Sequence, residues 1–121
     1  MATLLVIEDE LEVIDVLKDY FKHHGVEVLS AATGEEGLTL LEQKKPDLVL
    51  LDMKLGAGMS GMEVLRKARA LHTKTQIVVV SAVDDENVSN MALGLGASGY
   101  VTKPLTLQTI EEVVLSRLKG V

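Results

Sequence analysis

Four apolar residues followed by an acid, Leu48-Val49-Leu50-Leu51-Asp52, form the most informative run in this chain. An uninterrupted apolar run of this length is typical of a strand that is buried on both faces of a parallel sheet. Asp52 then stands at the carboxyl end of that strand, at the edge where open α/β sheets bind their ligands. The run therefore predicts both a fold class and a candidate functional residue.

Three further apolar runs lead into residues that can carry chemistry. The run Leu4–Ile7 is followed by Glu8 and Asp9, a later run ends on Ser81, and Lys103 follows a short fourth run. Because the carboxyl ends of parallel strands meet at one edge of a sheet, we expect three carboxylates, a hydroxyl and an ammonium to gather there. Such a set suits a divalent cation and a phosphoryl group.

Composition narrows the class of protein. The chain has 121 residues, 47% hydrophobic and 25% charged, which is the size and balance of one globular domain. A net charge of −6 argues against nucleic-acid binding through bulk electrostatics, and the absence of cysteine excludes disulfides and thiolate metal sites. The N-terminus lacks the basic patch of a secretory signal, and no stretch reaches the ~20 apolar residues of a membrane span. We expect a cytoplasmic protein with no membrane contact.

Apolar runs alternate with segments of helical periodicity five times along the chain, which predicts one α/β domain of the (βα)5 type with a doubly wound parallel sheet. The strands are predicted at Thr3–Glu8, Val26–Ala31, Asp47–Asp52, Gln76–Ser81 and Gly99–Thr102.

Helix boundaries are also marked in the sequence. Asp9, Thr33 and Ser60 are each followed three residues later by a glutamate, which predicts capping boxes at three helix starts. Gly25 and Gly96 are expected at left-handed helix ends.

The acids at the sheet edge predict a metal-assisted nucleophile. Carboxylates crowded together repel one another unless a cation neutralises them, and Mg²⁺ prefers hard oxygen ligands. With the cation bound, Asp52 is left to attack phosphorus, while Lys103 pairs with phosphoryl oxygens and Ser81 donates a hydrogen bond to one of them. Each residue alone is more often structural: an acid caps a helix, a lysine is solvated, and a serine bonds its own backbone. The coincidence of all of them favours the functional interpretation.

Four motifs carry a resemblance to a known family: Val6-Ile7-Glu8-Asp9-Glu10, Leu48-Val49-Leu50-Leu51-Asp52-Met53, Val80-Ser81-Ala82 and Gly99-Tyr100-Val101-Thr102-Lys103-Pro104. In order and spacing they resemble the response-regulator receiver domain of bacterial two-component signalling, and the likeness extends over residues 1–121. The resemblance implies a flavodoxin-like sheet with strand order 2-1-3-4-5. It also implies a phosphorylation-dependent switch rather than an enzyme with a separate substrate.

The resemblance implies a role for each residue of the edge. Asp52 is the phosphoacceptor, and a sensor histidine kinase or a phosphotransfer protein is the donor. The Mg²⁺ ligands implied are Glu8, Asp9, Asp52 and the backbone carbonyl of Lys54. Ser81 is the switch hydroxyl, Tyr100 the aromatic switch, and Lys103 the phosphoryl-binding lysine, with a cis bond before Pro104. A downstream protein is expected on the face of the fourth helix, fifth strand and fifth helix, which includes Met91, Leu95, Tyr100 and Leu105.

One segment departs from the family pattern. Gly56-Ala57-Gly58 stands where the family carries a proline, and the matching glycine, Gly61, comes nine residues after Asp52 instead of eight. We expect the added residue and the two glycines to raise the entropic cost of ordering this loop and to weaken Mg²⁺ binding.

Three alternatives share parts of this pattern. An aspartate-nucleophile phosphatase or phosphotransferase of the haloacid-dehalogenase type usually has a second aspartate two residues after the first, where this chain has Lys54. A flavin-binding carrier needs a phosphate loop after the first strand, where Glu8-Asp9-Glu10 stands. A receiver-like binding module without phosphotransfer is disfavoured by the intact set of side chains.

Overall fold

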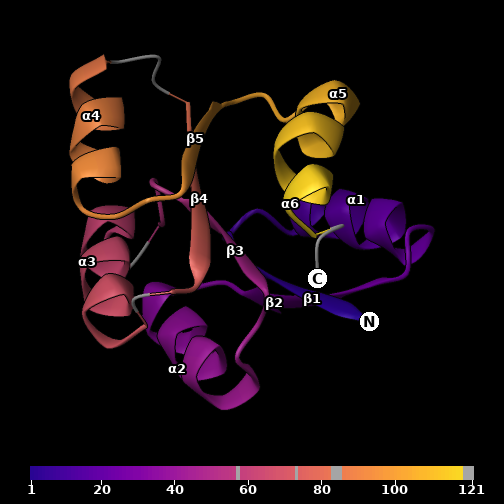
Figure 1. Ribbon diagram of the computed structural model, residues 1–121, viewed down its shortest axis with the longest axis horizontal. Helices are drawn as coiled ribbons and strands as arrows, with labels where there is room; N and C mark the ends of the chain where they lie inside the picture. Colours follow the sequence, from indigo (N-terminus) through magenta and orange to yellow (C-terminus); the bar gives the residue numbers. More distant parts are fainter. Residues whose placement is uncertain (57, 73, 83–85, 119–121) are drawn as a thin grey trace.

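Five parallel strands form one sheet in the order β2-β1-β3-β4-β5 (Figure 1). The computed structural model describes residues 1–56, 58–72, 74–82 and 86–118. The strands are β1 (Ala2–Ile7), β2 (Val26–Ala31), β3 (Leu48–Asp52), β4 (Gln76–Ser81) and β5 (Gly99–Thr102). The predicted fold class and the strand order implied by the resemblance are confirmed.

Helices cover both faces of the sheet (Figure 1). One face carries α1 (Leu11–Lys22) and a last helical segment made of α5 (Leu107–Thr109), the π-helix η1 (Ile110–Leu115) and α6 (Ser116–Leu118). The other face carries α2 (Gly34–Lys44), α3 (Gly61–Leu71) and α4 (Glu86–Gly94). No helix in the described part of the chain has the length and apolar character needed to cross a bilayer.

The strand side chains alternate between two apolar cores because successive residues of a strand point to opposite faces. Leu48 and Leu50 of β3 pack with α1 and the last helical segment, whereas Val49 and Leu51 pack with α2 and α3. Every residue of β3 is buried, as the apolar run predicted.

Two of the three predicted capping boxes form at their serine or threonine. The Thr33 hydroxyl accepts a hydrogen bond from the Glu36 amide, and the Ser60 hydroxyl accepts one from Glu63. The prediction for Asp9 is wrong, because α1 begins after Glu10 and has no side-chain cap. Gly25 and Gly96 have φ values of +70° and +105°, in the positive range expected for them.

Three strand limits also differ from the sequence analysis. β1 runs from Ala2 to Ile7 rather than from Thr3 to Glu8, and β3 begins at Leu48 rather than Asp47. Leu11 and Leu107, the first residues of α1 and α5, are apolar but 71% and 59% exposed.

Candidate functional site

Backbone pairing brings the predicted residues to one edge of the sheet. The Met53 amide donates to the Val80 carbonyl at 2.9 Å, and the Lys103 amide donates to the Ser81 carbonyl at 2.7 Å. These bonds extend the pairing of β3 with β4 and of β4 with β5 just past the strand ends. The carboxyl ends of β3, β4 and β5 therefore lie in a row at this edge.

Asp52 is held at this edge by two donors. Its Oδ2 atom lies 2.7 Å from Lys103 Nζ, and its Oδ1 atom accepts a hydrogen bond of 3.0 Å from the Lys54 amide. Only 3% of Asp52 is exposed. Burying a carboxylate is costly unless it is paired and hydrogen-bonded, and Lys103 and the Lys54 amide supply these partners to a potential nucleophile.

Glu8 lies beside this pair and is equally buried. Its Oε1 atom is 3.7 Å from Lys103 Nζ and has no hydrogen-bond partner among the described residues. Burial, followed by the neighbouring Asp52 carboxyl, raises the pKa of Glu8 from 4.5 to about 8, against the attraction of Lys103. A buried carboxyl group with an unpartnered oxygen and a raised pKa fits a cation site, because a bound cation would pair with that oxygen and favour the ionised form.

Lys103 contacts three acids. Besides Asp52 and Glu8, its Nζ atom lies 3.7 Å from Glu10 Oε1. Burial on its own lowers the pKa of Lys103, but the hydrogen bond to Asp52 and the charges of all three acids raise it overall. The side chain therefore stays cationic beside the candidate nucleophile.

The acids of the β1 end form a compact oxygen cluster. Ligand atoms of Glu8, Asp9 and Glu10 all lie within 4.8 Å of one another, and the last two are exposed. Hard carboxylate oxygens grouped in this way fit Mg²⁺. The sequence analysis gave Glu10 no role, although its position directly after Glu8 and Asp9 is a signal that could have included it.

The other predicted residues lie around this centre. Ser81 is buried, whereas Tyr100 is half-buried and packs against the core beneath α2, α3 and α4. The Lys54 side chain is exposed, and the Lys103–Pro104 bond is cis, as the resemblance implies. On the expected output face Met91 is 56% exposed.

The connection from β3 to α3 is pinned by two acids from elsewhere in the chain. Asp9 Oδ2 accepts a hydrogen bond of 2.8 Å from the Gly56 amide, and Glu35 Oε1 accepts one of 3.3 Å from the Met59 amide. Ala57, the residue taken as the insertion, lies outside the described residues.

Gly61 closes this connection against the end of β3. A Cβ atom there would lie 2.5 Å from Met53 Cα and 2.7 Å from the Asp52 carbonyl oxygen. Both atoms are backbone, so a larger residue would push on the strand end that carries Asp52.

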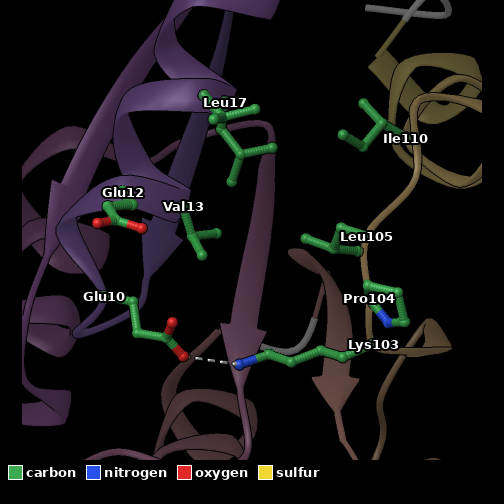
Figure 2. Close-up of a pocket in the computed structure, with 9 residues that line it drawn as sticks. Glu10, Glu12, Val13, Leu17, Lys103, Pro104, Leu105 and Ile110 are labelled. Carbon is green, nitrogen blue, oxygen red and sulfur yellow. Dashed lines mark ion pairs between the residues drawn. The ribbon is translucent and has the colours of Figure 1, made fainter.

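A groove of about 560 Å³ opens beside Lys103, between α1 and the connection from β5 to α5 (Figure 2). Its apolar lining includes Val13, Leu17 and Leu105, and the Glu10–Lys103 ion pair closes the end nearest Asp52.

Comparison with known proteins gives a consistent family. The model of the response regulator receiver domain matches residues 4–115. A CheY-like receiver domain protein from Methanospirillum hungatei is similar at 30% identity, with a TM-score of 0.90 over 99% of this chain and 95% of that one.

Two further structures have the same fold. The BeF3-activated N-terminal receiver domain of Klebsiella pneumoniae RstA is similar at 30% identity, with a TM-score of 0.85 over 98% of this chain and 96% of that one. NtrX from Brucella abortus matches 98% of this chain with 28% of its own, at 24% identity and a TM-score of 0.88.

Proposed function

The chain belongs to the response-regulator receiver domain family of two-component signalling, and from that premise we propose that it is switched by a phosphoryl group on Asp52. The donor is a sensor histidine kinase or a phosphotransfer protein. The observation that carries the proposal is the 2.7 Å contact between Lys103 Nζ and Asp52 Oδ2 at the carboxyl edge of the sheet. This contact places a cationic group beside the carboxylate, where it can stabilise the charge of an incoming phosphoryl group.

The acid cluster supports a Mg²⁺ requirement. The proposed ligands are Glu8, Asp9, Asp52 and the backbone carbonyl of Lys54. Glu10 lies close enough to Glu8 and Asp9 to bind the same ion, directly or through water. When bound, Mg²⁺ neutralises the carboxylates and the phosphoryl oxygens. Occupation of the site also gives a partner to the orphaned Oε1 atom of Glu8.

The proposed transfer is a displacement at phosphorus. A carboxylate oxygen of Asp52 forms the new bond, the bond between phosphorus and the donor's imidazole nitrogen breaks, and the electron pair of that bond stays with the imidazole. Lys103 then shifts its hydrogen bond from Asp52 to a phosphoryl oxygen, since the acyl phosphate leaves less charge on the aspartyl oxygens. Because Lys103 Nζ already lies 2.7 Å from Asp52 Oδ2, this shift needs only a short movement.

The proposed response links the site to the face formed by α4, β5 and α5. Ser81, buried at the end of β4, donates its hydroxyl to the phosphoryl group, and Tyr100 turns inward behind it. Exposed Met91 and half-buried Leu95 and Leu105 give that face apolar character for a downstream protein.

We propose a cytoplasmic protein, because its donors carry their phosphoryl groups there. The family match does not favour the phosphatase alternative.

Amide chemical shifts measured with Mg²⁺ and with or without beryllofluoride test this response. The proposal predicts changes at the metal site and also at Tyr100, Met91 and Leu95. Asp52→Asn is the matched control, since it keeps the shape of the side chain but removes the charge, and it should show neither set of changes. Changes confined to residues around Asp52 contradict the proposed switch.

A further inference from the structure

Two carboxylates from other parts of the chain hold the connection from β3 to α3, and only one of them is a proposed metal ligand. Asp9 holds Gly56 and Glu35 holds Met59, so one tether stands on each side of the glycine segment. Asp9 is a proposed metal ligand, whereas Glu35 lies in the first turn of α2, outside the acid cluster.

The Asp9 tether competes with the metal for the same carboxylate. The Asp9 Oδ2 atom lies 2.8 Å from the Gly56 amide, and a Cβ atom at Gly56 would lie 2.7 Å from that oxygen. A cation that takes this oxygen weakens its bond to Gly56, because the cation draws electron density from the oxygen and makes it a poorer acceptor. Among the described residues, Glu35 is the other side chain from outside the connection that holds it, and Glu35 lies outside the acid cluster.

The surroundings of Glu35 favour its contact with the connection. Its Oε2 atom would lie 2.7 Å from a Cβ atom at Gly58, so the carboxylate rests directly against a backbone that has a φ of +75°. Gly34 brings α2 close to the same segment, because a Cβ atom there would lie 3.2 Å from Met59 Cβ. A carboxylate in the first turn of a helix is also favoured by the exposed amides of that turn.

We infer that Glu35 is a positioning residue for the metal site: by holding Met59 to the start of α2, it keeps the connection, and with it the Lys54 carbonyl, near the cation after Asp9 is drawn away from Gly56. The inference rests on the proposed Mg²⁺ site. It assigns a share of metal affinity to a residue of α2 that contacts neither the metal nor the phosphoryl group. The two glycines make the tether more important here, because a flexible connection costs more entropy to fix.

Calorimetric Mg²⁺ titration of the whole chain tests the inference with four variants. Glu35→Ala should weaken Mg²⁺ binding about threefold to tenfold, the range expected from loss of one hydrogen bond. Glu36→Ala is the matched control, because it removes the same charge from the same turn, and no hydrogen bond or ion pair joins the Glu36 side chain to the described part of the connection. It should bind Mg²⁺ as the unaltered chain does. Glu35→Gln keeps an acceptor for the Met59 amide and should restore most of the affinity.

A second readout separates positioning from charge. Hydrogen exchange at the Met59 amide should be faster in Glu35→Ala than in Glu36→Ala, both with and without Mg²⁺. Equal Mg²⁺ affinities for the two alanine variants overturn the inference, as does an affinity in Glu35→Gln as low as in Glu35→Ala. Asp9→Asn, the fourth variant, reports on the proposed site itself: if it binds Mg²⁺ as well as the unaltered chain, the site assignment fails, whatever Glu35 does.

Discussion

The ionisation of Glu8 should make the stability of the metal-free protein depend on pH in an unusual direction. The pKa of Glu8 is raised from 4.5 to about 8 in the folded chain, chiefly by burial and then by Asp52. Between these two values the folded chain binds more protons than the unfolded chain, so the free energy of unfolding falls as pH rises. The stabilising contribution is complete below about pH 4.5 and is lost as pH rises through about 8.

The magnitude follows from the size of the shift. One pKa unit corresponds to about 1.4 kcal/mol, so the full change across this window is on the order of 5 kcal/mol for a side chain as buried as Glu8. Glu8→Gln removes the titration but keeps the shape of the side chain. The stability of Glu8→Gln relative to the unaltered chain should therefore increase steadily from pH 5 to pH 8.5.

Urea unfolding in the presence of a chelator measures this difference directly. The comparison between the two proteins cancels the pH effects that they share. A difference in unfolding free energy that stays constant across the pH range would refute the reasoning. Excess Mg²⁺ should reverse the fall in unfolding free energy of the unaltered chain with rising pH, because the cation favours ionised Glu8. In Glu8→Gln the effect of Mg²⁺ on the pH dependence should be much smaller.

Three further predictions concern the scaffold around the site. Gly61→Ala should lower the free energy of unfolding by about 1–3 kcal/mol, since the three atoms nearest to the added Cβ are backbone atoms of Met53 and Asp52; an unchanged urea midpoint would contradict this. Ser60→Ala should cost about 1 kcal/mol through loss of the cap on the Glu63 amide, and Ser60→Asp, which can cap equally well, should cost far less. Phe21→Ala should cost roughly 3–5 kcal/mol, because the ring is fully buried, and a smaller loss in thermal or urea unfolding would mean that the core collapses around the cavity.

The sheet and its functional edge could be predicted because both depend on local patterns. The run from Leu48 to Leu51 is apolar without interruption, and β3 is buried on both faces, so the position of Asp52 at the edge followed from one strand. The family resemblance supplied the strand order, which periodicity alone does not contain.

The tethers of the connection from β3 to α3 could not be predicted because they join distant parts of the chain. Asp9 has the spacing of a helix cap, yet its carboxylate accepts from Gly56, 47 residues later. Glu35 and Met59 are 24 residues apart, and nothing in the sequence near either one indicates the other. Such contacts depend on how α2 and α3 pack against each other.

The π-helix is a similar case. Ile110, Val114 and Leu118 have the spacing of an α-helix, and all three are buried as that spacing predicts. Side chains supply donors to two carbonyls of η1. The Ser116 hydroxyl donates a hydrogen bond to the Glu112 carbonyl, and the Arg117 guanidinium donates one to the Val113 carbonyl. In an α-helix these carbonyls would accept backbone amides four residues on. Periodicity reports which face is buried, but it does not report which donor satisfies each carbonyl.

Phosphorylation of Asp52 is the central claim, and intact-mass spectrometry after incubation with acetyl phosphate tests it most directly. The account predicts a single phosphoryl adduct on the unaltered chain with Mg²⁺, its loss when a chelator replaces Mg²⁺, and no adduct on Asp52→Asn under either condition. Circular dichroism of Asp52→Asn should match that of the unaltered chain, which shows that the variant is folded. An Asp52→Asn protein that is phosphorylated as readily as the unaltered chain, or an unaltered chain that gains no adduct with Mg²⁺, would contradict the account.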